Sequence, residues 1–356
     1  MVFLKNVYSN IGLRPKRKEK EKTMKKKNTG KAGKIVKTIL KILGIILAVI
    51  VVLILICAIR HAFKNRSDRK LYKDAYGQYF TTSSGDRLNY TFMDSDSEKV
   101  AVILPGMGCA STRYEFDAFA KEINDDYKLI LVDPLGYGLS DQASTPRTVE
   151  NYCSELHELM NSLEYDKYTI IGHSIAGIYA VYYANTYTDE VEAFIGIDAS
   201  APHQMDADMA IAKPDNMVTL YTFMKYGLYE TGIYRIMTEL GKDQVMATVP
   251  DLSKEDQDKY LALYCETPLN KTQMDEVKHL GYNMEKTYDM KFPESIPVLY
   301  VLSQDNCNTM DIWEPIHKDL VTNPDSKIVI IEGAHYLHQT NFDGLINEID
   351  NWKYEE

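Results

Sequence analysis

The sequence lacks any closely spaced pair of cysteines. Its five cysteines are scattered over 356 residues, and none belongs to a Cys-x-x-Cys pattern. This spacing indicates neither a disulfide framework nor a zinc site. No internal repeat is present, and the hydrophobic content of 45% is that of an ordinary packed protein. A repeat array and a small disulfide-rich scaffold are therefore excluded.

Positive charge is scarce outside the N-terminal segment. Residues 1–41 carry 14 Lys and Arg against two Glu, whereas the rest of the chain carries 26 basic and 49 acidic residues, a net charge near −23. Because this part of the chain is strongly negative, it repels nucleic acid, and we expect no nucleic-acid partner. The basic segment 1–41 is predicted to be a disordered tail that acts as a membrane-topology signal.

Residues 42–59 form an uncharged, mostly aliphatic run. At about 1.5 Å per residue a helix of this run is roughly 27 Å long, which predicts a single transmembrane helix followed by a linker over 60–76. A cleaved signal peptide is the alternative, but the basic region is too long and no Ala-x-Ala pattern follows. Eight lysines and no acid in 22–41 favour a protein of the cell membrane with a cytoplasmic N-terminus and with the chain after the helix outside the cell, although basic residues after the run weaken this asymmetry.

Short apolar runs bounded by turns alternate with helical patterns over residues 77–200 and 295–356. Continuous rather than alternating hydrophobicity is typical of strands buried on both faces of a parallel sheet. The alternation stops over 201–294, where a helical lid is expected at the carboxyl edge of the sheet. Several side chains of this segment are candidates to line an apolar substrate site, or else to form the core of the lid: Tyr221, Phe223, Met224, Tyr226, Tyr229 and Tyr234.

Ser174 lies between a predicted buried strand and a predicted helix, in Gly172-His-Ser-Ile-Ala176. A nucleophilic serine on such a sharp turn needs small residues two positions before and after it, and Gly172 and Ala176 meet this need. A serine that merely caps the helix is the alternative. The strand–turn–helix context favours a nucleophile.

A glycine-rich turn, Pro105-Gly-Met-Gly108, follows another predicted strand. Backbone N–H groups in such a turn can stabilise a tetrahedral oxyanion. We assign the oxyanion hole to the N–H groups of Met107 and Ile175. A plain strand-to-helix turn is the alternative.

Residues Asp133, Gly136, Gly138 and Ser140 resemble the Asp-x-x-Gly-x-Gly-x-Ser turn of the α/β-hydrolase superfamily. In that family the turn falls between the oxyanion turn and the nucleophile, as it does here. The resemblance implies a mostly parallel, doubly wound sheet with a lid insertion. It also implies that these four residues shape a loop and that Asp133 is not catalytic.

The resemblance further implies a catalytic base and acid nearer the C-terminus. Gly333-Ala-His335 is similar to the family's Gly-x-His turn, so His335 is the expected base. For the acid, Ser303-Gln-Asp305 stands where the family usually has Gly-x-x-Asp, which favours Asp305. Asp198, at the end of an earlier predicted strand, is the alternative. The order nucleophile, acid, base is that of α/β-hydrolases.

The predicted function is therefore that of a membrane-anchored serine hydrolase. It would cleave a carboxylic ester or related small-molecule acyl compound through an acyl-enzyme on Ser174, with an apolar substrate if the lid side chains line the site. A serine at this position excludes the aspartate-dependent relatives that open epoxides. An acyltransferase or peptidase with the same triad, and a non-catalytic binding protein, are the alternatives. Neither a cofactor nor a metal ion is expected.

Overall fold

The computed structural model describes residues 16–207, 209, 213–352 and 354. Contacts between residues divide the chain into two units that join between Ile56 and Cys57. The first unit consists, within the described residues, of most of one long helix, α1 (Lys16–Tyr72). The second contains a sheet, its covering helices and the last turns of α1.

Helix α1 is longer than the sequence predicted. Residues 16–41, for which we expected disorder, are helical, and so is most of the expected linker, up to Tyr72; residues 1–15 lie outside the described part of the chain. Lysine and glutamate are good helix formers, and the sequence has no proline between Pro15 and Tyr72 that would stop the helix. Between Lys31 and Tyr72 the helix is long and apolar enough to cross a membrane, by length and composition.

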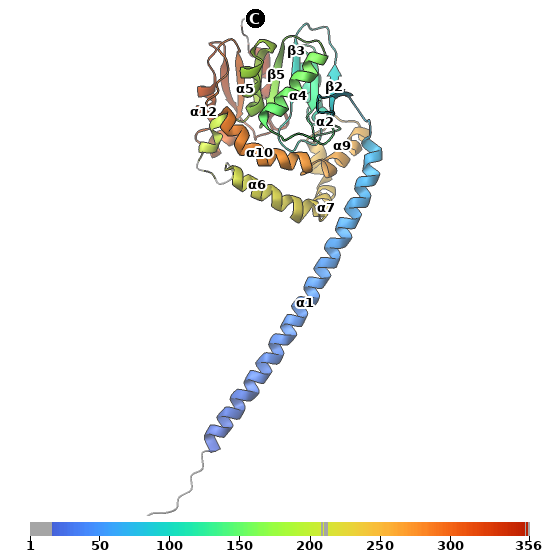
Figure 1. Ribbon diagram of the computed structural model, residues 1–356, viewed down its shortest axis with the longest axis vertical. Coiled ribbons are helices and arrows are strands. Elements are labelled where there is room, and N and C mark those ends of the chain that lie inside the picture. The colour runs from blue at the N-terminus through green and yellow to red at the C-terminus, as the bar shows by residue number, and fades with distance from the viewer. Residues whose placement is uncertain (1–15, 208, 210–212, 353, 355–356) are drawn as a thin grey trace, which may run out of the picture. The chain divides into compact units, whose positions relative to one another are not determined.

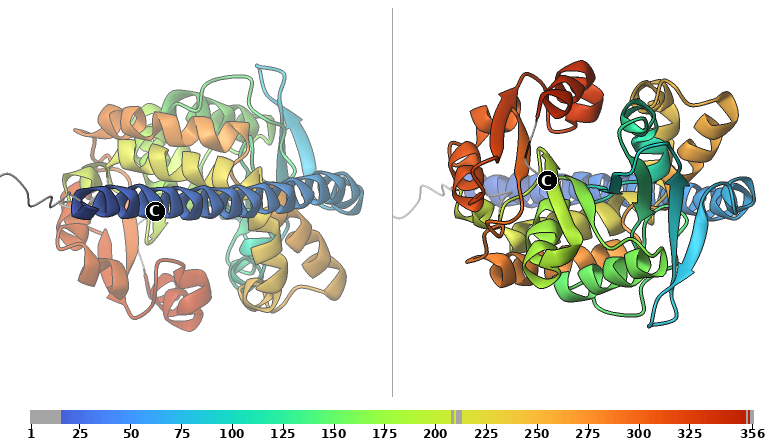
Figure 2. Two further views of the ribbon diagram at one scale, coloured as in Figure 1. Left: turned by 90° about the horizontal axis from the view of Figure 1, so that it is seen from below. Right: turned by 90° about the horizontal axis from the view of Figure 1, so that it is seen from above.

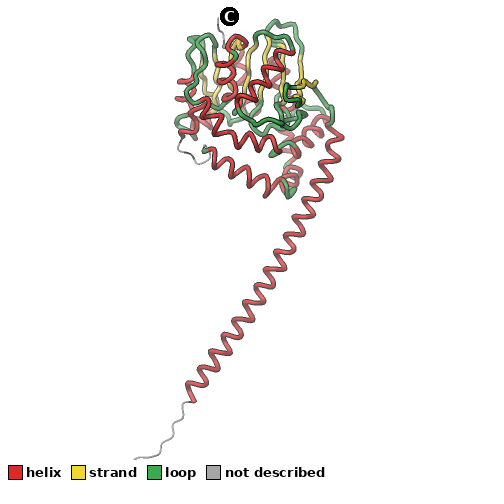
Figure 3. The backbone as a smooth tube through the Cα atoms, viewed as in Figure 1, coloured by secondary structure: helices red, strands yellow, loops and turns green. Residues whose placement is uncertain are grey.

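Eight strands form one sheet, drawn as a single layer in Figure 3, in the order β1-β2-β4-β3-β5-β6-β7-β8. The first two strands are antiparallel to their neighbours and the other six run parallel. The strands are β1 (Gln78–Thr81), β2 (Arg87–Met93), β3 (Val100–Leu104), β4 (Lys128–Asp133), β5 (Tyr168–His173), β6 (Val191–Ile197), β7 (Val298–Ser303) and β8 (Lys327–Ile331). The predicted fold class, a mostly parallel α/β sheet, is confirmed.

Helices cover both faces of the sheet (Figure 2). Those between or after the strands are α2 (Thr112–Glu115), α3 (Asp117–Ile123), α4 (Val149–Ser162), α5 (Ala176–Thr186), α11 (Gln304–Thr309), α12 (Trp313–Leu320), α13 (Leu337–Thr340) and α14 (Phe342–Asn351), with a 3-10 turn η1 (Thr188–Glu190) after α5. Strand β3 shows how the core is divided. Val102 and Leu104 pack with α4, α5 and α12 on one face, and Ala101 and Ile103 with α3 and α14 on the other.

A helical insertion separates β6 from β7 (Figure 1). It contains the 3-10 turn η2 (Pro202–Asp206), α6 (Pro214–Phe223), the π-helical turn η4 (Met224–Tyr229), α7 (Ile233–Leu240), α8 (Lys242–Ala247), α9 (Lys254–Glu266) and α10 (Lys271–Thr287). Helix α10 contacts the loop after β4, because Gln273 donates to the carbonyl of Gly136 and Tyr137 donates to Glu276. The insertion therefore packs over the carboxyl ends of the strands.

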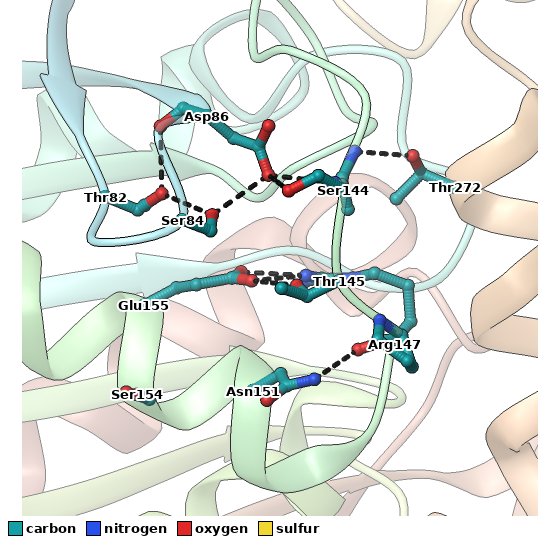
Figure 4. A network of polar contacts seen from close by, with 12 residues as sticks. Thr82, Ser84, Asp86, Ser144, Thr145, Arg147, Asn151, Ser154, Glu155 and Thr272 are labelled. Atoms are coloured by element: carbon teal, nitrogen blue, oxygen red, sulfur yellow. Dashed lines mark hydrogen bonds and ion pairs between the residues drawn. The ribbon is translucent and has the colours of Figure 1, made fainter.

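A polar network fixes the loop that precedes α4 (Figure 4). Asp86, in the β1–β2 turn, accepts hydrogen bonds from the backbone and hydroxyl of Ser144 at 2.8 and 2.7 Å. Thr272 on α10 accepts the N–H of Ala143 at 2.8 Å. The fully buried Arg147 donates to both oxygens of the α4 residue Glu155. These bonds tie the hairpin, α4 and the insertion together beneath the site.

Candidate active site

Ser174 occupies the turn between β5 and α5, with a φ of 54° in the left-handed region that non-glycine residues rarely adopt. Its neighbours must be small. A Cβ on Gly172 would lie 3.1 Å from the Cβ of Ala176, and one on Gly177 would lie 2.2 Å from the carbonyl oxygen of Ser200. The turn lifts the Ser174 hydroxyl above the sheet edge, where the side chain is partly exposed.

His335 lies in the loop after β8, and its Nε2 is 2.9 Å from the Oγ of Ser174. The loop is held in place from the nucleophile side, because the Nε2 of His173 donates to the carbonyl of His335 at 3.1 Å. The structure thus brings together the predicted nucleophile and the predicted base, which are 161 residues apart in the sequence.

Asp198, the alternative acid, is the carboxylate that contacts His335. It follows β6 with a φ of 41°, is fully buried, and its Oδ2 lies 2.7 Å from the Nδ1 of His335. When the Nδ1–H of His335 donates to Asp198, the Nε2 of the same ring is left as an acceptor for the Ser174 hydroxyl. A continuous hydrogen-bonded chain therefore runs from Asp198 through His335 to Ser174.

The favoured acid, Asp305, does not contact His335, whereas the alternative acid, Asp198, does. Helix α11 begins at Gln304, directly after β7, so Asp305 falls in its first turn with an exposed side chain. Its backbone N–H donates to the carbonyl of Gly333 at 3.3 Å. No loop is left after β7 to carry the Asp305 carboxylate toward the histidine.

Three residues that the sequence reasoning missed hold Asp198. Its Oδ1 accepts the N–H of Ser303 and the indole N–H of Trp313, each at 2.9 Å. Its Oδ2 accepts the Ser303 hydroxyl at 2.9 Å and the Asn306 amide at 2.7 Å, besides His335. These donors satisfy both oxygens of the buried carboxylate and fix its orientation. A polar Ser-x-x-Asn directly after a predicted strand was the available signal.

The turn after β3 faces the nucleophile. A Cβ on Gly106 would lie 2.6 Å from the Nδ1 of His173 and 3.1 Å from the Cβ of Ser174, so only glycine allows this approach. Among the described residues, the N–H groups of Met107 and Ile175, predicted to form the oxyanion hole, donate to no recorded protein acceptor. The next amide, Gly108, donates to the Tyr137 hydroxyl at 3.4 Å.

Two further histidines lie behind the site and are uncharged near neutral pH. Burial lowers the pKa of His173 well below its usual value, and the nearby His338 and His335 lower it further. Burial, and then His335, lowers the pKa of His338 to about 3. His338 stacks on Phe116 at a ring separation of 4.3 Å. Neither histidine contacts Ser174 as His335 does, so both are supporting residues.

Asp133 and its turn have the loop-shaping place that the motif predicted. The buried carboxylate accepts the N–H groups of Thr112 at 2.8 Å and Leu139 at 3.1 Å, and the hydroxyl of Tyr76 at 2.6 Å. Burial raises its pKa, and these donors offset part of that rise. A Cβ on Gly138 would lie 1.8 Å from its Oδ2, which explains the glycine. Asp133 contacts neither Ser174 nor His335.

A cavity of about 390 Å³ adjoins the oxyanion turn and is lined by Gly106, Met107 and His173 on the sheet side. Of the insertion residues named as candidates from the sequence, Tyr221, Met224 and Tyr234 line this cavity. The others do not line this cavity: Phe223 and Tyr226 are exposed and Tyr229 is buried. Within the described residues, no group of three or more His, Cys, Asp or Glu side chains is arranged to hold a metal ion.

Comparison with known proteins agrees with this fold. Residues 100–342 match the model of the alpha/beta hydrolase fold family, which is more than half of the chain, so the chain belongs to that family. It is 24% identical to the uncharacterized protein YbdG of Bacillus subtilis over 216 residues, 60% of this chain and 65% of that protein. It is 27% identical to epoxide hydrolase 1 of Caenorhabditis elegans over 121 residues, 33% of this chain and 29% of that protein.

These matches span less than two thirds of the length of either relative. Among solved structures, Cfl2 from Burkholderia cenocepacia superposes with a TM-score of 0.61 at 16% identity, covering 78% of this chain and 95% of that one. At this identity the likeness concerns the fold alone.

Proposed function

We propose that this protein is a serine hydrolase that cleaves a carboxylic ester or a related acyl compound. The observation that carries the proposal is the chain of hydrogen bonds from Asp198 to His335 at 2.7 Å and from His335 to Ser174 at 2.9 Å. An imidazole held between a buried carboxylate and a serine hydroxyl is the arrangement that activates serine toward a carbonyl carbon.

In the proposed reaction the Oγ of Ser174 attacks the carbonyl carbon while the Nε2 of His335 takes its proton. The N–H groups of Met107 and Ile175 stabilise the oxyanion that forms. His335 then gives the proton to the leaving group, which departs and leaves an acyl-enzyme. Water, deprotonated by the same imidazole, releases the acid and restores Ser174. Asp198 orients the imidazole and stabilises its charged form.

Acyl transfer is favoured over epoxide opening, although one relative is named an epoxide hydrolase. Opening an epoxide through an ester intermediate needs a carboxylate at the nucleophile position, and a serine stands there. An acyltransferase or a peptidase would use the same three residues. An acyltransferase would pass the acyl group to an alcohol or amine instead of water, and a peptidase would cleave an amide bond. Product analysis with and without an added alcohol or amine distinguishes these reactions.

We further propose that α1 anchors the enzyme in the cell membrane, with a cytoplasmic N-terminus and the catalytic unit outside. The support is the apolar stretch of the helix and the lysines that precede it. An anchored catalytic unit would act on substrates at or near the membrane surface.

Labelling with a fluorophosphonate probe tests the nucleophile. The full-length protein in detergent should be labelled, and Ser174→Ala should abolish labelling. Ser84→Ala, in the exposed β1–β2 turn, is the matched control and should be labelled like the unchanged protein. A folded but unlabelled wild type would contradict the proposal. A series of p-nitrophenyl esters of increasing acyl length then measures turnover and acyl preference together.

A further inference from the structure

The cavity beside the oxyanion turn has an aromatic wall. Met107 and His173, which are close in sequence or space to the nucleophile turn, border it, and most of its remaining lining comes from the insertion. Five tyrosines line it: Tyr221, Tyr234, Tyr260, Tyr264 and Tyr336. Their rings adjoin one another, with centroids 6.4 Å apart between Tyr234 and Tyr264 and 5.8 Å apart between Tyr260 and Tyr264. A group inside the cavity would therefore lie against several ring faces and edges.

A single carboxylate, Glu115, lines this cavity. It ends the short helix α2 and uses one oxygen, Oε1, to accept the N–H of Ala110 at 2.8 Å. Among the side chains that the structure describes, no lysine or arginine forms an ion pair with it. The neighbouring Arg113 is paired with Asp117 instead. The cavity thus contains an acidic group without a protein counter-charge.

The groups that face Glu115 are acidic, phenolic or neutral. Burial raises its pKa to about 7, with a small further rise from Asp133, while hydrogen bonds from Ala110, Cys109 and Tyr260 lower it. The hydroxyls of Tyr264 and Tyr336 lie near enough for the Glu115 charge to raise their pKa values. On its other side Glu115 borders a smaller cavity with Asp117 and with His338, whose pKa of about 3 leaves it uncharged. None of these groups supplies a positive charge at neutral pH.

We propose that this cavity binds a positively charged substrate group, an ammonium or quaternary ammonium, with Glu115 as its counter-charge and the tyrosine rings as its walls. Aromatic rings attract cations through their negative faces, and a carboxylate shielded from water attracts them strongly. This inference rests on the proposed function, since it assigns the substrate class of the same site. It makes Glu115 a specificity-determining residue.

The charge of Glu115 can be separated from its structural bond to Ala110. Glutamine keeps the shape and an oxygen that accepts the Ala110 N–H, but it has no charge. Glu115→Gln should therefore preserve the turn before α2 and remove only the attraction for a cation. Glu122→Gln, on the exposed face of α3, makes the same change outside the cavity and is the matched control.

The test uses two esters with the same acyl group. One has a choline leaving group, and in the other a neutral tert-butyl group replaces the trimethylammonium. For the full-length protein we expect kcat/KM to favour the charged ester by about tenfold or more. Glu115→Gln should bring this ratio close to one, and Glu122→Gln should not change it. The ratio should also rise as the pH passes through 7, because the carboxylate form of Glu115 binds the cation.

Binding of tetramethylammonium to the Ser174→Ala protein, measured by calorimetry, separates the two proposals. Hydrolysis of both esters without preference for the charged one would overturn the cation site and leave the hydrolase. Ammonium binding that Glu115→Gln abolishes, without hydrolysis of either ester by the wild type, would support the site and contradict the hydrolase. If neither binding nor hydrolysis is found, both proposals are wrong.

Discussion

At the scale of single residues, the Asp198 carboxylate has a donor on every side. Ser303, Asn306 and Trp313 provide four hydrogen bonds, and His335 provides the fifth. Removing a carboxylate from water without such donors would favour its neutral form. The donors fix its direction, so the imidazole has one favourable orientation. Ser303, Asn306 and Trp313 thereby help to determine the geometry at Ser174.

Replacing the two candidate acids tests this assignment. Asp198→Asn should lower kcat on a p-nitrophenyl ester by about 10³-fold or more, because the amide no longer stabilises the Nδ1–H tautomer and the imidazolium. Asp305→Asn should leave kcat within about twofold, because that side chain is exposed on α11. Loss of turnover in Asp305→Asn alone would restore the assignment made from the sequence.

The contact between Ser174 and His335 was predictable because each residue lies in a short motif with a characteristic local backbone geometry. The carboxylate beside His335 was not, because Asp198 and Asp305 both follow buried strands and precede polar residues. The choice depends on how soon a helix begins after β7, and on partners such as Trp313 that lie more than a hundred residues from Asp198. Contacts between residues so far apart in the chain leave no short motif in a single sequence.

His338 should make stability depend on pH. Its pKa is about 3 in the folded protein and about 6.5 when unfolded, so between these values the unfolded chain binds more protons. The free energy of unfolding therefore falls as pH decreases from about 6.5 toward 3. His338→Phe keeps a ring against Phe116 and has no titrating group.

Urea unfolding at a series of pH values checks this prediction. The stability of the His338→Phe protein relative to wild type should increase as the pH falls below about 6.5, by about 1 kcal/mol or more at pH 5. A difference that stays constant over this range would show that burial does not suppress protonation of His338.

At the scale of elements, the last turns of α1 pack on the insertion. Arg235 on α7 is almost fully buried and donates to Asp68 at 2.7 Å and to Asn65 at 2.5 Å. Arg69 and Tyr72, one turn further on, donate to Glu266 at the end of α9. Because Tyr234, next to Arg235, lines the cavity, this contact also positions one cavity wall.

Arg235→Met should destabilise this contact by up to about 3 kcal/mol, because it leaves the largely buried Asp68 carboxylate with only the half-exposed Lys64, at 3.7 Å, as a cationic partner. Hydrogen exchange of residues 60–72 should become faster, and KM for the ester should rise as the Tyr234 wall loosens. The double variant Arg235→Met with Asp68→Leu should recover most of the loss. Lys254→Met, which removes an exposed pair with Asp258, is the control and should change little. Unchanged exchange in Arg235→Met would contradict this role.

The sequence predicted elements better than their arrangement. The strand expected before the turn at Pro105–Gly108 is present as β3 (Val100–Leu104). Strands buried on both faces have a composition that identifies them without any neighbour. The length of α1 was underestimated because charge density indicated disorder, although the same lysines favour a helix. The packing of the insertion depends on pairs such as Arg235 and Asp68, which no local pattern marks.

At the scale of the whole molecule, charge and hydrophobicity are unevenly distributed along the chain. The basic residues concentrate before an apolar stretch of α1, and the acidic residues concentrate in the catalytic unit. Lysines next to a transmembrane helix favour the cytoplasmic side, whereas acidic domains are translocated with little hindrance. The orientation of the helix and its anchoring in the membrane therefore need separate tests.

Anchoring can be tested by alkaline carbonate extraction of membranes from cells that express the full chain. The unchanged protein should stay in the pellet. Val51→Arg together with Leu55→Arg should move a large part of it to the supernatant, since each arginine near the centre of a membrane helix costs about 2.5–3.5 kcal/mol. Val51→Leu is the control that keeps the helix apolar. A membrane-impermeant fluorophosphonate should label the wild type in intact cells if the catalytic unit is outside. Labelling only after lysis would reverse the orientation, and full extraction of the unchanged protein would contradict the anchor, because a spanning helix resists carbonate.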